Sequence, residues 1–123
     1  MLKTNGNILT LTGSAKRRDL ISALVELYRV AVTHMPADVV TGLKKGLRTE
    51  TNPRAKHVLK TMLKNIDMAD CETRPLCQDT GIPLVYVQYQ SGKYHQLELK
   101  KIIKEATTIA TREVPMRANA YDI

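Results

Sequence analysis

The run IPLVYVQYQ at residues 82–90 constrains the fold of this chain more than any other feature. It is rich in β-branched and aromatic side chains, as strands are, and Ser91-Gly92 follows it as a turn. Most of the remaining sequence repeats its apolar residues at helical spacing. A single strand needs partners, because its backbone groups are otherwise unpaired. We therefore predict a mostly helical α+β domain in which residues 82–90 form a strand close to the preceding loop.

Four segments have the periodicity of amphipathic helices. The first begins with Ser14 as its N-cap and continues to about His34, and the second has Pro36 in its first turn. The third starts at Asn52-Pro53, and the fourth covers about 96–112. The residues expected to face the core are Leu20, Leu24, Leu27 and Ala31 in the first helix, Val39, Val40, Leu43 and Leu47 in the second, Ala55, Val58 or Leu59, Met62 and Ile66 in the third, and Leu99, Ile102, Ile103, Ala106 and Ile109 in the fourth.

Composition limits the class of protein. Residues 1–13 are expected to form an irregular arm, and residues 14–123 to form part of one domain. Hydrophobic residues make up 43% of the 123-residue chain, so it can bury a core although it contains no Phe or Trp. No apolar run is long enough to span a membrane, and the first residues lack the layout of a signal peptide. Two cysteines are too few for a disulfide framework. We expect a soluble, cytoplasmic protein.

The net charge of +7 lies mainly in the first seventy residues, which hold twelve Lys and Arg against six Asp and Glu. Such a surface attracts nucleic acid or raises the local concentration of a small dianion. It is also the ordinary solvated surface of helices. No nucleic-acid-binding motif is present, and only five Tyr could stack on bases, so we expect no specific nucleic-acid partner.

The stretch RPLCQDTG, residues 74–81, places a thiol, an amide, a carboxylate and a hydroxyl in a row before a glycine. Cys77 could act as a nucleophile or as a metal ligand. A nucleophile needs a nearby base, and the three histidines show no patterned relation to Cys77, so metal ligation fits better. Gln78 can hydrogen-bond a carboxylate or hydroxyl, and Asp79 can accept a proton. From the cysteine count alone, reduced and partly buried thiols are the alternative.

RPLCQDTG resembles the cysteine motif of the iron–sulfur hydro-lyases, the class I fumarate hydratase and L-tartrate dehydratase alpha-subunit family. The resemblance extends upstream to HMPADVVTGLKK and NPRAKHVLKTMLKNIDMAD, and downstream to ATREVPMRANAYD. It covers the chain from about Ser14 to the C-terminus and corresponds to the amino-terminal part of the family's alpha subunit or its equivalent. The chain departs from the family at Ala118 and Tyr121, where a proline and a valine are usual, so we expect an altered loop there.

The resemblance implies a hydro-lyase that hydrates fumarate to malate or dehydrates tartrate, using a 4Fe–4S cluster held by three cysteines with one iron open to substrate. Cys77 matches the first cluster ligand. Gln78 and Asp79 match substrate-contact positions, and Asp79 is the expected catalytic residue in proton transfer. Arg117 matches an arginine that binds a substrate carboxylate, and a solvated loop arginine is the alternative.

The same resemblance implies that the cluster ligands are incomplete in this sequence. The family continues well beyond the position of Ile123 and supplies two further cysteines there, and Cys71 is not at a matching position. We therefore expect a fragment, a truncated gene product or one piece of a split enzyme, inactive alone. The expected partners are a small dicarboxylate, the remaining enzyme segment or a beta subunit, and a second copy of the chain, with no membrane. The alternatives are a catalytically inactive remnant that acts through protein interaction and a basic helical nucleic-acid-binding protein.

Overall fold

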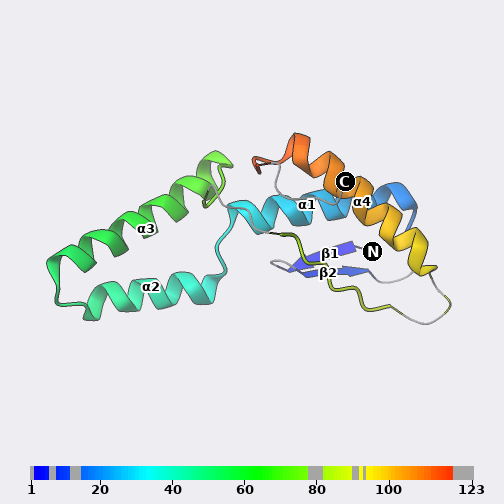
Figure 1. Ribbon diagram of the computed structural model, residues 1–123. Coiled ribbons are helices and arrows are strands. Elements are labelled where there is room, and N and C mark those ends of the chain that lie inside the picture. The colour runs from blue at the N-terminus through cyan, green and yellow to red at the C-terminus, as the bar shows by residue number, and fades with distance from the viewer. Residues whose placement is uncertain are drawn as a thin grey trace.

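The computed structural model describes residues 2–5, 8–11, 15–77, 82–89, 92 and 94–117. This part of the chain is mostly helical, as predicted. Its helices are α1 (Arg17–Thr33), α2 (Ala37–Thr49), α3 (Pro53–Glu72) and α4 (Gln96–Glu113). The molecule is elongated: α1 packs against α4, and α2 and α3 form a helical hairpin that extends away from them (Figure 1).

The main core lies between α1 and α4. Its buried residues are Ile21, Val25, Ile102, Ala106, Ala110 and Val114. Ala106 and Ala110 are fully buried, and their small side chains let the two helices approach closely. The core-facing positions predicted for the fourth helix are therefore confirmed at Ile102 and Ala106. The prediction for the first helix was wrong at Ala31, which is exposed, because the packed stripe passes instead through Val32.

The helix starts agree with the sequence to different degrees. α4 begins at Gln96, as predicted, and α2 begins directly after Pro36. α1 begins at Arg17, later than predicted, and its N-cap residue Lys16 makes no side-chain capping bond. Ser14, the predicted cap, lies outside the described residues. Among the described residues, no helix combines the length and the apolar character needed to cross a membrane.

Side-chain caps organise the connection between α2 and α3. The Asn52 Oδ1 accepts hydrogen bonds from the backbone N–H groups of Arg54 (2.9 Å) and Ala55 (3.3 Å), so the predicted start of α3 is confirmed. The Glu50 carboxylate accepts from the N–H groups of Asn52 (2.9 Å) and Thr51 (2.8 Å), and these hydrogen bonds lower the pKa of Glu50. The connection is thus held by its own side chains.

The predicted strand at residues 82–90 is not formed in the part of the chain that the structure describes. Residues 82–89 have no regular secondary structure and are exposed, and residue 90 lies outside the described residues. Two strands occur instead in the arm that we expected to be irregular: β1 (Leu2–Asn5) pairs antiparallel with β2 (Ile8–Leu11). These neighbours in sequence satisfy each other's backbone groups, whereas no described segment pairs with residues 82–89.

Candidate functional site

The Cys77 thiol follows α3 through a short loop. α3 ends at Thr73, which is in the left-handed region (φ 51°, ψ 46°), and the N–H of Arg74 donates to the carbonyl of Ala69 at 3.0 Å. This arrangement satisfies the last carbonyls of the helix and turns the chain away from its axis. Cys77 is exposed at the end of the loop, and Cys71 is exposed on the last turn of α3.

Leu76 attaches this loop to two helices. Its N–H donates to the carbonyl oxygen of Val32 in α1 (2.9 Å), and its carbonyl accepts from the side-chain Nδ2 of Asn65 in α3 (2.8 Å). Val32 lies in the last turn of α1. The residue before Cys77 is therefore held at the C-terminal end of α1.

A second connection joins α1 and α3. The Nε2 of His34, the C-cap residue of α1, lies 2.7 Å from Oδ1 of Asp70, and its Nδ1 lies 2.7 Å from Oγ1 of Thr33. Thr33 is fully buried, and its hydroxyl donates to the carbonyl of Arg29 at 2.8 Å. Because the His34 and Asp70 side chains are both about half exposed, this pair adds little stability to the contact between the two helices.

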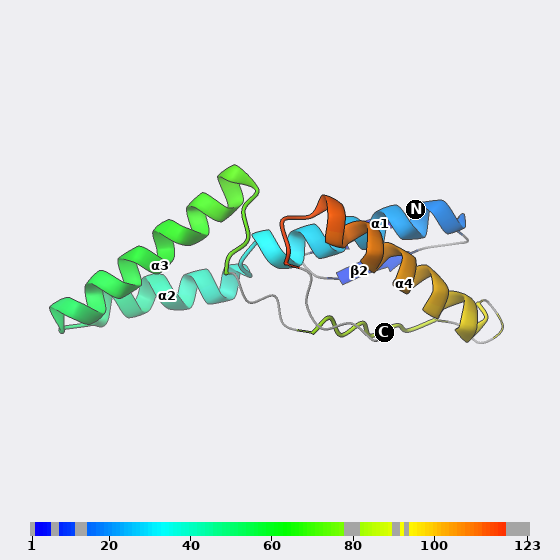
Figure 2. The same ribbon diagram turned by 45° about the horizontal axis from the view of Figure 1, so that its top comes forward.

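Arg117 lies in the segment that follows α4. Val114 is buried and Met116 packs against the core of α1 and α4, so this segment is anchored, while Arg117 itself is exposed. In both views the red end of the described chain turns back to the C-terminal end of α1 (Figure 1 and Figure 2). The structure therefore brings the Cys77 loop and the Arg117 segment to the same end of α1. Gln78 and Asp79 lie outside the described residues, and their roles stay predictions.

The donor set for a metal is incomplete in the described residues. They contain no group of three or more His, Cys, Asp and Glu side chains placed to hold a metal ion. The chain has two cysteines, and each carries an exposed thiol. This arrangement fits one thiolate ligand from Cys77, and it does not fit the complete ligand set of a cluster held by three cysteines.

A groove also lies between α1 and α4. Its apolar lining includes Ile21 and Ile109, and its charged lining includes Arg17 and Glu105. Arg17 and Glu105 form an ion pair, and the hydrogen bond to the carboxylate raises the pKa of the guanidinium. Neither Cys77 nor Arg117 lines this groove, so it is separate from the predicted site.

Comparison with known protein families decides the relationship. The family model for fumarate hydratase (Fumerase) matches residues 21–123, which include the Cys77 loop and the Arg117 segment. The chain belongs to the fumarate hydratase family. Hydro-lyase chemistry is therefore the activity of its family, and the resemblance carried by the cysteine motif is confirmed.

Individual relatives agree with this membership. "Putative L(+)-tartrate dehydratase subunit alpha" of Methanocaldococcus jannaschii is 37% identical over 99 residues, which are 78% of this chain and 34% of the relative. "L(+)-tartrate dehydratase subunit alpha" of Escherichia coli is 40% identical over 91 residues, 74% of this chain and 30% of the relative. "Putative fumarate hydratase class I" of Geobacillus stearothermophilus is 34% identical over 104 residues, 84% of this chain and 20% of the relative. The chain thus spans between a fifth and a third of these fumarate hydratase family members.

The residues that attach the Cys77 loop to the helices are not indicated by the local sequence. Asn65 bonds a carbonyl eleven residues further along the chain, and His34 pairs with Asp70 on another helix. No local spacing connects such partners. The one available signal is Asn65 itself, because asparagine is a weak helix former in the interior of a long helix.

Proposed function

We propose that this chain supplies the amino-terminal part of an iron–sulfur-dependent hydro-lyase that acts on a small dicarboxylate. The reaction is the reversible hydration of fumarate to malate or the dehydration of tartrate. One observation carries the proposal: the exposed Cys77 thiol ends a loop that is attached to α1 and α3, within the segment matched by the family model.

In this proposal, Cys77 provides one thiolate ligand to a 4Fe–4S cluster, and two further cysteines come from outside this chain. When bound, such a cluster would supply a Lewis acid for the leaving hydroxyl of the substrate. The exposure of Cys77 supports this role, because a ligand shared with another segment must be reachable from outside the chain.

The chain's own residues then bind the substrate and move a proton. Arg117 binds a substrate carboxylate through the two parallel N–H groups of its guanidinium. Gln78 donates a hydrogen bond to a substrate oxygen, and Asp79 accepts or returns the proton. The support for including Arg117 is that its segment and the Cys77 loop lie at the same end of α1 (Figure 2).

The names of two relatives, as alpha subunits, support a multi-subunit enzyme. We propose that the missing ligands belong to the remaining segment of the enzyme, or to a beta subunit, and that the assembly is cytoplasmic. A second candidate function is a catalytically inactive remnant that acts through protein interaction.

Anaerobic reconstitution with iron and sulfide tests the proposal. The isolated chain is expected to hold no stable cluster and to leave fumarate and tartrate unchanged, because Cys77 alone cannot retain a cluster. With the missing segments supplied from a family relative, it is expected to gain cluster and turnover. Cys77→Ser should then abolish both, and Asp79→Asn should keep the cluster but slow turnover.

Cys71→Ser is the matched control, since it removes the other exposed thiol and should leave cluster and turnover intact. A stoichiometric cluster with turnover in the isolated chain would show that the ligand count is wrong. If the chain gains neither cluster nor turnover when the missing segments are supplied, the result would favour a catalytically inactive remnant that acts through protein interaction.

A further inference from the structure

Two different helices hydrogen-bond the same residue, Leu76, of the loop that carries Cys77. Both backbone groups of Leu76 are bonded: its N–H to Val32 of α1 at 2.9 Å, and its carbonyl to the Asn65 amide of α3 at 2.8 Å. A residue held through both of its backbone groups has little freedom to rotate. The position of the next residue, Cys77, therefore depends on these two hydrogen bonds.

The two partners of Leu76, the Val32 carbonyl and the Asn65 amide, lie on helices that contact each other. His34 at the end of α1 pairs with Asp70 of α3 at 2.7 Å, and the neighbouring Thr33 is fully buried. Ala69, beside Asp70, is 1% exposed, so this part of α3 is packed. Leu76 is thus hydrogen-bonded to two helices that also contact each other through His34 and Asp70.

Asn65 is the side chain in this arrangement that the helix does not require. It is exposed in the interior of α3, a position where lysine, glutamate or alanine is the better helix former. Its side-chain amide donates a hydrogen bond to the Leu76 carbonyl of the loop, outside its own helix. The contact across eleven residues gives a physical reason for an asparagine at this position.

We propose that Asn65 is a positioning residue for Cys77. Its amide, together with the Val32 carbonyl, holds Leu76 so that the Cys77 thiol is presented from a defined point at the C-terminal end of α1. The ligand of the Cys77 thiol rests on the proposed function. The role of Asn65 in holding the loop is independent of that function, and it can be tested without iron.

Asn65→Asp is the decisive variant, because it keeps the size of the side chain and replaces the N–H donor with an oxygen that repels the Leu76 carbonyl. Hydrogen exchange of the Leu76 N–H reports how often its bond to the Val32 carbonyl opens. In the 123-residue chain this exchange is expected to become about tenfold faster, because loss of the Asn65 hydrogen bond makes opening of the loop easier by about the free energy of one hydrogen bond. Amides in α3 should keep their protection. Thr61→Ala, one turn earlier and exposed on the same helix, should leave Leu76 exchange unchanged.

A nitroxide label separates positioning of the loop from general loosening of the helix. The label is placed on Cys77 in a Cys71→Ser chain, and on Cys71 in a Cys77→Ser chain. Asn65→Asp should sharpen the spectrum of the Cys77 label and leave that of the Cys71 label unchanged. No change at either position, or an equal change at both, would overturn the role of Asn65, whether or not the chain belongs to an active hydro-lyase.

Discussion

Thr73 ends α3 in a backbone conformation that suits glycine. Its φ of 51° makes it the non-glycine residue with positive φ in the described part of the chain. A β-branched side chain is strained there, and Thr73 is exposed, so its side chain has little packing to lose. Thr73→Gly is therefore expected to raise the free energy of unfolding by roughly 0.5–1 kcal/mol, net of the greater freedom of glycine in the unfolded chain.

The matched control is Thr61→Gly, which makes the same change at an exposed position inside α3 where φ is helical. This variant should lose roughly 0.3–0.5 kcal/mol, because the helix propensity of glycine is lower than that of threonine. Urea midpoints measured for both variants would give opposite signs. A loss of stability in Thr73→Gly would show that the left-handed turn carries no strain.

Individual residues of the candidate site differ in how well the sequence alone indicates them. Cys77 and Arg117 could be predicted as site residues because each lies in a motif that is readable along the chain, and their roles stay predictions. Asn52 was found as a cap because its acceptors lie two and three residues away. Asn65 and His34 could not be found, because their partners come from other elements and their distances depend on how α1 and α3 pack.

At the scale of elements, helices were predicted well and strands poorly. A helix satisfies its backbone within itself, so apolar spacing locates α3 and α4 from local sequence. A strand is satisfied only by a neighbour. The β-rich composition of residues 82–89 therefore did not produce a strand where no described segment pairs with it, and β1 formed with β2 because the two are adjacent in sequence.

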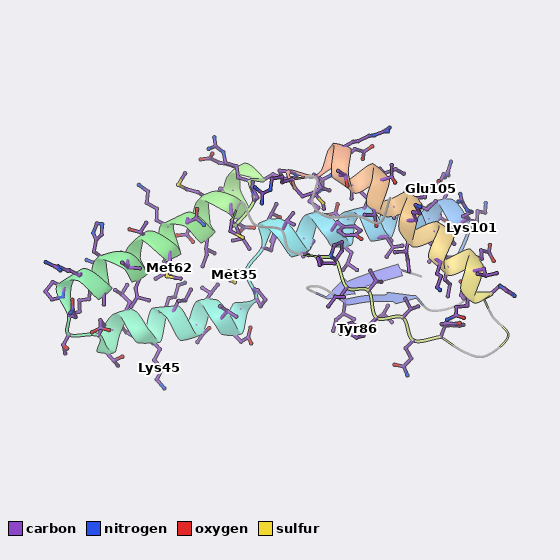
Figure 3. All side chains as sticks on the ribbon, in the orientation of Figure 1. Met35, Lys45, Met62, Tyr86, Lys101 and Glu105 are labelled. Atoms are coloured by element: carbon purple, nitrogen blue, oxygen red, sulfur yellow. The ribbon has the colours of Figure 1, made fainter. Side chains whose placement is uncertain are left out.

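Positive charge is concentrated in the part of the α2–α3 hairpin around the connection between its two helices. Residues 40–66, which lie around the α2–α3 connection, hold seven Lys and Arg and one acidic residue, Glu50, a net charge of +6. The whole hairpin, residues 37–72, also contains Asp38, Asp67, Asp70 and Glu72, so its net charge is +2. The cationic residues are Lys44, Lys45, Arg48, Arg54, Lys56, Lys60 and Lys64. Figure 3 shows Lys45 pointing away from α3, while Met62 lies on the side of α3 that faces α2. Positive charge is therefore gathered around the connected ends of α2 and α3, while the other ends of the two helices carry acidic residues.

We predict that the basic residues of this hairpin bind duplex DNA weakly, in a salt-sensitive way and without sequence preference. Residues 40–66 supply positive charge, and residues 37–72 contain no Phe, Trp or Tyr that could stack on bases. Changing Lys56, Lys60 and Lys64 together to Glu should abolish the binding. The control changes Lys100, Lys101 and Lys104 of α4 to Glu, which alters the net charge equally and should weaken binding less. Fluorescence anisotropy across a salt series would measure both, and tight binding with a sequence preference would contradict the prediction.

At the scale of the whole molecule, the shape leaves apolar side chains uncovered. Ile82, Leu84 and Tyr86 are 71%, 75% and 92% exposed, whereas Val85 and Val87 are 39% and 47% exposed. This alternation is typical of an extended segment that presents one face outward. An exposed apolar row with unpaired backbone groups is a surface on which another strand pairs.

We therefore expect the 123-residue chain to self-associate or to bind a partner through residues 82–87. Light scattering at high concentration should give a mass above that of one chain. Leu84→Lys combined with Tyr86→Lys should return the chain to a monomer, because charges on the outward face oppose pairing. The control, Val58→Lys with Leu97→Lys, places the same charges on exposed apolar residues of α3 and α4 and should leave the association in place. A monomeric parent chain, or an equal effect of the two double variants, would show that residues 82–87 do not form the contact.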